Sequence, residues 1–229
     1  MRNSTSVPYK IINSGSDGNC TILNDAIAID LGVSYKKLGD YARKIKLVLL
    51  THEHSDHFNK KTIAQLISRH PAVKFVCLEY LVAELAKIVP KASIYVLEAN
   101  KLYDLGLCRI AAFPLEHDVP NCGYRIQIGD FKAIYATDTK ELKVSAKNYD
   151  LYLIEANYDL IEIMDRINTK RAKGEYVYEI RAINNHLSKQ QCDDFLYKNM
   201  GEKSKFEYMH QHKEKTNDKK IQIDHQQCT

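Results

Sequence analysis

A cluster of metal-binding side chains directly after a short apolar run constrains this chain more than any other feature of its sequence. Leu47–Leu50 is followed by Thr51–Phe58, which reads THEHSDHF and holds three histidines and an aspartate within six residues. An apolar run ahead of a polar cluster is typical of a buried strand that ends at the edge of a sheet. We therefore expect the cluster to lie on a loop at that edge.

The spacing of these side chains favours a metal site. His52 and His54 are two residues apart, so on an extended chain they point to the same side and can bind one ion. Asp56 and His57 can face a second ion beside the first. Imidazole and carboxylate suit zinc and similar divalent ions. The alternative is a polar loop rich in histidine by chance, which is the weaker interpretation because the chain has only 9 histidines in 229 residues.

Composition excludes several classes of protein. A chain of 229 residues with 45% hydrophobic and 27% charged residues is typical of a globular protein with a substantial core. No stretch approaches the roughly 20 apolar residues that cross a bilayer, and the start, MRNSTSVPYKII, lacks the apolar region of a secretory signal. The six cysteines form no CxxC pair, which predicts reduced thiols in a cytoplasmic protein. A net charge of +4 permits a phosphate-bearing substrate without demanding one.

Helical and strand patterns alternate along the chain, which predicts a layered α/β architecture. Since neither a repeat nor a linker stands out, we expect one domain over residues 1–215 and a polar tail over 216–229, in which Ile221–Ile223 can form a small strand. Apolar residues at helical spacing mark Tyr35–Ile45, Lys60–Arg69, Tyr80–Val89, Asp159–Arg171 and Ser188–Lys198. Short apolar runs mark strands at Cys20–Leu23, Ala26–Asp30, Leu47–Leu50, Val73–Cys77, Ile94–Leu97, Leu107–Pro114, Tyr124–Ile128, Phe131–Ala136, Leu151–Glu155 and Phe206–Met209.

Further candidate ligands follow later predicted strands. His117 lies in FPLEHDVPNCGYRI, Asp138 in YATDT and His210 in YMHQHK. A lone histidine is more often a surface or core residue, and an aspartate at a strand end is often a cap. His210 follows its strand most directly, so we favour it as the last ligand, while His212 and His186 remain open alternatives.

The motif HxHxDH after an apolar strand resembles the signature of the metallo-β-lactamase-fold hydrolases. CGY after His117 is similar to the third motif of that family, and Asp138 stands where a bridging aspartate usually follows a glycine, which is alanine and threonine here. Glu155 in LIEAN and His186 in NNHLS resemble a glutamate–histidine pair of tRNase Z, although the alternative for His186 is a residue beside a helix cap at Ser188. SGSDGN, EAN and HLS are more similar to small bacterial exonuclease-type members, and the long arm of tRNase Z is not apparent.

The resemblance implies an αββα sandwich of two mixed β-sheets flanked by helices, with two divalent ions, zinc or manganese, at one edge. His52, His54 and His117 would hold one ion, and Asp138 would bridge. Two cations lower the pKa of a shared water, so a bridging hydroxide forms near neutral pH and attacks a phosphate ester. The resemblance implies that the second ion is held by Asp56, His57 and His210, and that Asp30 supports the metal-binding loop. It assigns catalysis to Asp56, Glu155 and His186, and His186 would protonate the leaving oxygen.

These roles predict a dinuclear-metal-dependent phosphodiester hydrolase of the DNA exonuclease type, with a nucleic acid or nucleotide as substrate and no membrane partner. A phosphodiesterase for small cyclic or signalling nucleotides and a metal-containing binding or regulatory protein without turnover are the alternatives. The oligomeric state stays open, a homodimer included. Several basic residues can contact a nucleic-acid backbone, and the alternative is that they form a solvated face. They are Arg166, Lys170, Arg171, Lys173 and Arg181, of which Arg181 is nearest to His186.

Overall fold

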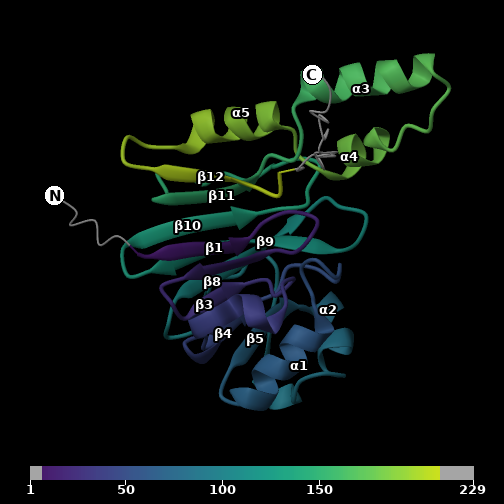
Figure 1. Ribbon diagram of the computed structural model, residues 1–229. Helices are drawn as coiled ribbons and strands as arrows, with labels where there is room; N and C mark the ends of the chain where they lie inside the picture. Colours follow the sequence, from purple (N-terminus) through teal and green to yellow (C-terminus); the bar gives the residue numbers. More distant parts are fainter. Residues whose placement is uncertain (1–6, 212–229) are drawn as a thin grey trace, which may run out of the picture.

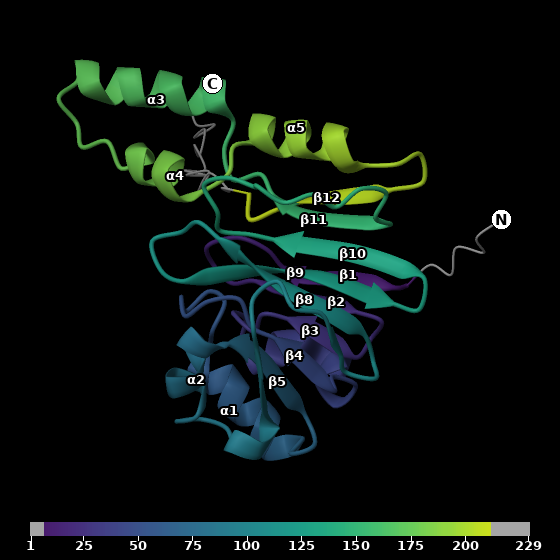
Figure 2. The same ribbon diagram turned by 180° about the vertical axis from the view of Figure 1, so that it is seen from behind.

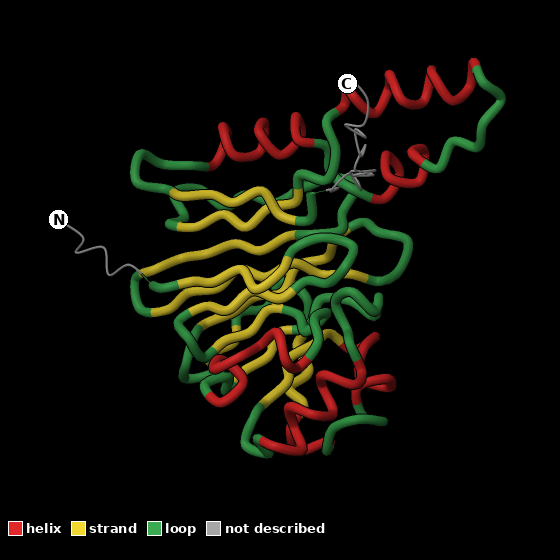
Figure 3. Tube along the Cα trace, viewed as in Figure 1, coloured by secondary structure: helices red, strands yellow, loops and turns green. Residues whose placement is uncertain are grey.

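Residues 7–211 are described by the computed structural model, in which two six-stranded sheets pack face to face and helices cover both outer faces (Figures 1 and 3). This confirms the predicted αββα sandwich. The predicted tail, with its small strand at Ile221–Ile223, and His212 lie outside the described residues. Within the described part of the chain, no helix is long and apolar enough to span a membrane.

The first sheet comes entirely from the N-terminal half of the chain. Its first three strands are antiparallel neighbours, and its third to sixth strands run parallel. The parallel strands are mostly buried apolar runs, as expected where both faces of a sheet are covered. The strands, in spatial order, are β1 (Tyr9–Asn13), β2 (Cys20–Leu23), β3 (Ile27–Ile29), β4 (Leu47–Leu49), β5 (Lys74–Leu78) and β6 (Ile94–Leu97). The helices of this half are η1 (Tyr35–Arg43), α1 (Lys60–Arg69), α2 (Glu79–Leu85) and η2 (Lys91–Ser93).

The second sheet comes entirely from the C-terminal half. Its first four strands are antiparallel neighbours, and its last three run parallel. Helix α5 (Lys189–Asn199) packs on its outer face. The strands are β7 (Tyr103–Asp104), β8 (Arg109–Leu115), β9 (Asn121–Ile128), β10 (Phe131–Ala136), β11 (Leu151–Glu155) and β12 (Lys205–Met209).

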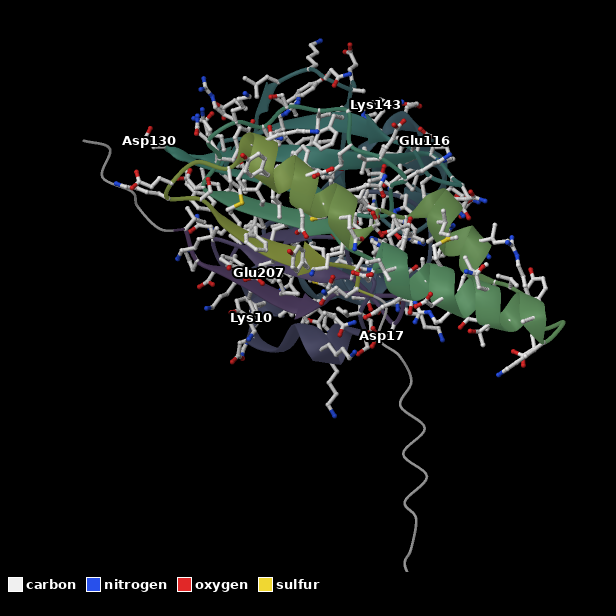
Figure 4. The ribbon with its side chains drawn as sticks, turned by 90° about the horizontal axis from the view of Figure 1, so that it is seen from above. Lys10, Asp17, Glu116, Asp130, Lys143 and Glu207 are labelled. Atoms are coloured by element: carbon white, nitrogen blue, oxygen red, sulfur yellow. The ribbon has the colours of Figure 1, made fainter. Side chains whose placement is uncertain are left out.

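Apolar side chains fill three layers, which fixes the two sheets relative to each other. Leu49 of the first sheet packs with Tyr124 and Tyr135 of the second in the layer between them. Burying such side chains contributes about 1.5–3 kcal/mol each. The edge strands are also joined, because the Tyr9 hydroxyl donates a 2.7 Å hydrogen bond to Glu207. Figure 4 shows Glu207 along the edge where β12 and β1 lie side by side.

Two helices form a hairpin that extends beyond the sheets, as Figures 2 and 4 show. They are α3 (Leu160–Ala172) and α4 (Glu179–Asn185), and a small apolar cluster that includes Tyr158 and Ile163 packs between them. Helix α3 begins where the Asp159 carboxylate accepts hydrogen bonds from two backbone amides of the first turn. The hairpin is thus packed mainly on itself.

Several predicted boundaries differ from the structure for identifiable reasons. The segment predicted as a helix over Tyr35–Ile45 is a 3₁₀ helix interrupted at Gly39, whose φ of 55° no continuous helix allows. Helix α2 ends at Leu85, earlier than predicted, and the chain reaches Pro90 through a turn. The strands β1 and β7 and the helix α4 were not predicted. The five cysteines within the described residues are unpaired and buried.

Candidate metal centre

The residues predicted to carry function converge at one edge of the sandwich, where several strands end. The loop after β4 carries THEHSDHF, His117 follows β8, Asp138 follows β10, Glu155 ends β11 and His210 follows β12. A cavity of about 390 Å³ opens at this edge. Its lining includes the predicted residues His54, Asp56, His117, Asp138, Arg181, His186 and His210.

Three imidazoles form the first group that can hold an ion. Nitrogen atoms of His52, His54 and His117 all lie within 4.8 Å of one another. The Nδ1 atom of His117 lies 3.1 Å from the Asn185 carbonyl, which can only accept, so Nδ1 carries the proton and Nε2 keeps its lone pair. That Nε2 lies 3.3 Å from Nδ1 of His54. The ring nitrogens of the three histidines are therefore close enough to bind one ion together.

A second group lies beside the first. Atoms of Asp56, His57 and His210 lie within 4.8 Å of one another, as the predicted second ion requires. Asp138 stands between the groups, because its Oδ2 atom is 2.8 Å from His57 Nε2 and 3.1 Å from His210 Nδ1. Asp138 also falls within 4.8 Å of His52 and His57 taken together. This is the place that a bridging carboxylate requires.

Several buried polar atoms at this edge lack hydrogen-bond partners within the described part of the protein and are suited to bind a metal ion. His52 Nε2, Asp138 Oδ2 and His210 Nδ1 are buried and have no hydrogen-bond partner of acceptable geometry. Leaving such atoms unpaired costs about 1–3 kcal/mol each, so native structures rarely do so without a ligand. Nitrogen and carboxylate donors at these spacings are the set that divalent ions bind. We conclude that the residues present fit divalent metal ions.

Asp30 holds the metal-binding loop from behind. It is fully buried and accepts hydrogen bonds from the backbone amide of Thr51 at 2.9 Å and from its hydroxyl at 3.0 Å. Its other oxygen lies 2.7 Å from His57 Nδ1, so that nitrogen is the donor and His57 Nε2 faces Asp138. The Tyr135 hydroxyl donates to the same oxygen at 3.3 Å. These contacts are those that the predicted supporting role needs.

Close packing fixes the backbone of the same loop. The Tyr80 hydroxyl donates to the Thr51 carbonyl and the Tyr124 hydroxyl to the Leu50 carbonyl, both at 2.5 Å. Gly32 lies so close to the loop that a Cβ atom there would stand 1.6 Å from the Asp56 carbonyl oxygen. No side chain fits in that space, so the approach of the two segments requires glycine.

Three residues of the centre have left-handed backbone conformations that side chains usually avoid. Asp30, Asp138 and His210 have φ values of 59°, 57° and 50°, and each follows the end of a strand. Such conformations cost about 1–3 kcal/mol each and cluster at functional sites. For Asp138, the Asn121 side chain offsets part of this cost by donating to the carbonyls of Thr137 and Asp138 at 3.0 and 2.7 Å.

Glu155 and His186 form a hydrogen-bonded pair at the wall of the cavity. His186 Nδ1 lies 2.7 Å from one oxygen of Glu155 and 3.5 Å from Asp138 Oδ1. The other oxygen of the buried Glu155 accepts from the backbone amides of Thr139 and Leu187 at 2.9 and 3.1 Å. Burial lowers the pKa of His186, but Glu155 and nearby carboxylates raise it more, so its pKa is above the ordinary value. The pair therefore favours a proton on His186.

Burial and neighbouring charges shift the pKa values of the other groups in different directions. Burial, reinforced by neighbouring histidines, lowers the pKa of His52, and burial also lowers that of His117. Both imidazoles are therefore neutral near pH 7, the form that binds metals. Burial raises the pKa of Asp138, but His57 and His210 outweigh it and hold that pKa well below its usual range. Asp138 is thus an anion, and the same carboxylate together with Asp30 outweighs burial and raises the pKa of His57 well above its ordinary value.

Of the five basic residues singled out in the sequence, Arg181 is the one that lines the cavity. Its guanidinium donates a 3.0 Å hydrogen bond to Asp118, and its side chain is 77% exposed. Lys170 instead makes a 2.6 Å ion pair with the buried Glu179. Asp118, which sequence reasoning missed although it adjoins His117, also lies 3.1 Å from His117 Nε2.

Two other contributors were not singled out as site residues in the sequence, although Asn19 belongs to the SGSDGN motif. The Asn19 amide nitrogen lies 2.8 Å from His57 Nε2, and the Tyr178 ring lines the cavity. His186 was an alternative for the last ligand, but its Nδ1 atom is engaged with Glu155. His210 lies with Asp56 and His57 as the predicted second group requires, and His186 lies with Asp138, Glu155 and His210 in another group whose atoms are within 4.8 Å of one another.

Comparisons with known proteins agree with this architecture. A family model described as the beta-lactamase superfamily domain matches residues 29–175. Among solved structures, the metallo-beta-lactamase fold protein YhfI from Bacillus subtilis aligns with a TM-score of 0.68 and 17% identity, covering 89% of this chain and 85% of that chain. The short form of human tRNase Z aligns with a TM-score of 0.63 and 16% identity, covering 90% of this chain and 92% of that chain.

A third similar structure is Zn²⁺-bound PqqB from Methylobacterium extorquens, with a TM-score of 0.57 and 11% identity over 79% of this chain and 80% of that chain. No curated protein sequence matches the chain. At these identities, the likeness to the solved structures shows a shared fold.

Proposed function

The chain belongs to the beta-lactamase superfamily, whose members are mostly metal-dependent hydrolases, and we propose that it is a divalent-metal-dependent phosphodiesterase, a nuclease of the DNA exonuclease type. The observation that carries the proposal is the pair of Glu155 and His186, which lies 3.5 Å from Asp138 at the wall of the cavity. Hydrolysis of an alkyl phosphodiester needs a proton for the departing oxygen, and this pair is positioned to supply it.

Seven residues would hold the ions. We assign His52, His54 and His117 to one ion and Asp56, His57 and His210 to a second, with Asp138 shared, and zinc or manganese suits this donor set. When bound, two such ions activate a water and neutralise the phosphate.

The chain itself would position the substrate and move the proton. Arg181 binds a phosphate oxygen at the mouth of the cavity, in competition with Asp118. Asp56, whose side chain is 23% exposed toward the cavity, accepts a hydrogen bond from the attacking water. His186 then gives the proton on a ring nitrogen to the leaving oxygen, and Glu155 stabilises the imidazolium beforehand. The likeness of the fold to human tRNase Z supports phosphodiester chemistry for this arrangement.

The test is hydrolysis by purified protein loaded with Zn²⁺ or Mn²⁺ against single-stranded DNA, duplex DNA, RNA and cyclic nucleotides. His54→Ala and Asp138→Asn are expected to reduce cleavage by about 10³-fold or more and to lower the metal content. His70→Ala, which changes a histidine outside the cavity, is the matched control and should behave like the wild type.

Three outcomes would decide against parts of the proposal. Turnover of cyclic nucleotides without DNA cleavage would replace a nuclease with a small-nucleotide phosphodiesterase. A metal-loaded wild type that cleaves none of the substrates would instead indicate a metal-containing binding protein. Wild-type activity in both variants would remove the metal centre from the reaction.

A further inference from the structure

One face of helix α4 forms a wall of the cavity. The residues of this element that line it are Tyr178, Arg181, Ala182 and Asn185. They are spaced three, four and seven residues after the first, which places them on one side of a helix. The Asn185 carbonyl accepts the 3.1 Å hydrogen bond from His117, and His186 follows the helix directly. The wall is therefore tied to both the metal-binding group and the proposed acid.

The Tyr178 ring on this wall is exposed and yet held in place. It is 54% exposed, and the Lys170 ammonium lies 3.7 Å from the ring centroid. Lys170 is in turn fixed by its 2.6 Å ion pair with Glu179, whose side chain is only 3% exposed. The Lys170 side chain keeps 21% of its surface exposed, so this ion pair and the ring lie at the border between the hairpin and solvent. The arrangement orients an aromatic ring that the core does not use.

Resting on the phosphodiesterase proposed above, we infer that Tyr178 stacks on the base of a nucleotide at a single-stranded end of the substrate, while Arg181 binds the adjoining phosphate. Aromatic faces stack on every kind of base, whereas a guanidinium recognises phosphate. Tyr178 and Arg181 stand one helical turn apart on the same wall, so one nucleotide meets both groups. A base inside a duplex has both faces covered, so the ring needs a base with a free face, which an unpaired end provides.

The positions of these residues along helix α4 also indicate how a bound nucleotide would be oriented. Tyr178 stands seven residues, about 10 Å along the helix axis, before Asn185, which contacts His117. Arg181 lies between Tyr178 and Asn185 on the wall, so a nucleotide that uses both groups has its base on Tyr178 and its phosphate on the side of the metal-binding group. Stacking would select which phosphate is cleaved, with no hydrogen bond that reads the identity of the base.

Binding of a fluorescent oligonucleotide tests this inference without relying on turnover. Single-stranded DNA with 2-aminopurine at its end, whose emission is quenched by stacking, is titrated onto the full chain loaded with Zn²⁺ in a His186→Ala background that slows cleavage. Adding Tyr178→Ala should weaken binding about 10-fold and abolish the quenching, and Tyr178→Phe should retain both.

The matched control is Tyr176→Ala, since Tyr176 is 87% exposed, two residues away and not part of the cavity wall. Equal binding and quenching by the Tyr178→Ala and Tyr176→Ala proteins would overturn the inference. An oligonucleotide with an abasic end should bind the wild-type and Tyr178→Ala proteins alike, and a persisting 10-fold difference would also overturn it. Hydrolysis of bis(p-nitrophenyl) phosphate by the wild type, a substrate without a base, separately tests the proposed function.

Discussion

The two halves of the chain contribute to the site in different ways. The N-terminal half, which forms the first sheet, supplies four candidate ligands on one loop, from His52 to His57. The C-terminal half supplies His117, Asp138 and His210 from the ends of three different strands. A loop of consecutive residues can be recognised from its spacing, while ligands on separate strands meet only because the second sheet brings the strand ends to one edge.

The halves also differ in what surrounds their ligands. In the N-terminal half, Asp30 and Thr51 form a buried network behind the loop and do not reach the cavity lining. In the C-terminal half, the proton-carrying pair and the wall formed by α4 face the cavity. Both halves supply ligands, but we expect the network behind the N-terminal loop to affect metal affinity alone, and the Glu155–His186 pair and the α4 wall of the C-terminal half to determine turnover and substrate binding.

Among the variants that distinguish the roles of the two halves, Glu155→Gln and His186→Ala are expected to have the largest effect on activity. Both variants should lower kcat on DNA by about 10²-fold or more, because the leaving oxygen loses its proton donor. The loss should be smaller on bis(p-nitrophenyl) phosphate, whose leaving group needs no proton. Metal content, measured by elemental analysis, should stay at the wild-type value, and a parallel loss of metal would break the proposed division.

An effect of about 10–100-fold on metal affinity is expected from Asp30→Asn, because the amide no longer orients His57 through a charged acceptor. Titration with Zn²⁺ against a competing chelator measures the affinity, and activity at saturating metal should return close to that of the wild type. Asp40→Asn, at an exposed position of the same half, is the control. If saturating metal fails to restore activity, the N-terminal half does more than hold metal.

A smaller effect is expected from Arg181→Ala. The KM for single-stranded DNA should rise about 5-fold, and the slope of log binding constant against log salt should flatten by about 0.7, the value for one phosphate contact. Arg43→Ala is a matched control, because that arginine is also 77% exposed and pairs with an aspartate at 2.8 Å, but it lies outside the cavity. Equal salt slopes for the two variants would exclude Arg181 from phosphate binding.

The smallest effect at neutral pH concerns Tyr124, which joins the halves through the Leu50 carbonyl. Burial raises the pKa of this phenol well above its ordinary value, so the folded state keeps a proton that the unfolded chain releases above about pH 10. Its contribution to stability is complete below that pH and is lost as the pH rises through the folded-state pKa.

Urea unfolding followed across alkaline pH measures this contribution. Tyr124→Phe should cost about 1 kcal/mol at neutral pH and should weaken the alkaline loss of stability. Tyr197→Phe, at a position that is 91% exposed, should leave both unchanged. An alkaline profile of the Tyr124→Phe protein identical to the wild type would show that the phenol does not link the halves.

Local patterns predict much of the fold. Lys60–Arg69 and Phe131–Ala136 are observed with the predicted bounds, because the first has an apolar helical face and the second is an apolar run that starts directly after the Gly129-Asp130 turn. Helix α4 was missed because it has only seven residues, and its apolar residues Ile180, Ala182 and Ile183 are too few to mark a helical stripe. The buried polar contacts between distant segments, such as that of Asn121 with Asp138, have no local signal at all.

The site shows the same limit. The loop from His52 to His57 was predicted from spacing, whereas His210 was favoured only because it follows its strand most directly, with His186 and His212 left open. The left-handed conformations of Asp138 and His210 also depend on strand ends fixed by the whole sheet. Sequence patterns indicate which residues carry chemistry, and the packing of the two sheets decides where they meet.

Each sheet is made from one continuous part of the chain. Ions held in the proposed way would therefore link the two sheets to each other. Neither half offers a full set of donors before the two have docked, so binding would favour the docked arrangement by mass action. Without bound metal, the protein would then lose stability as well as activity. Binding of the proposed ions would thus raise the free energy of unfolding of the whole two-sheet structure.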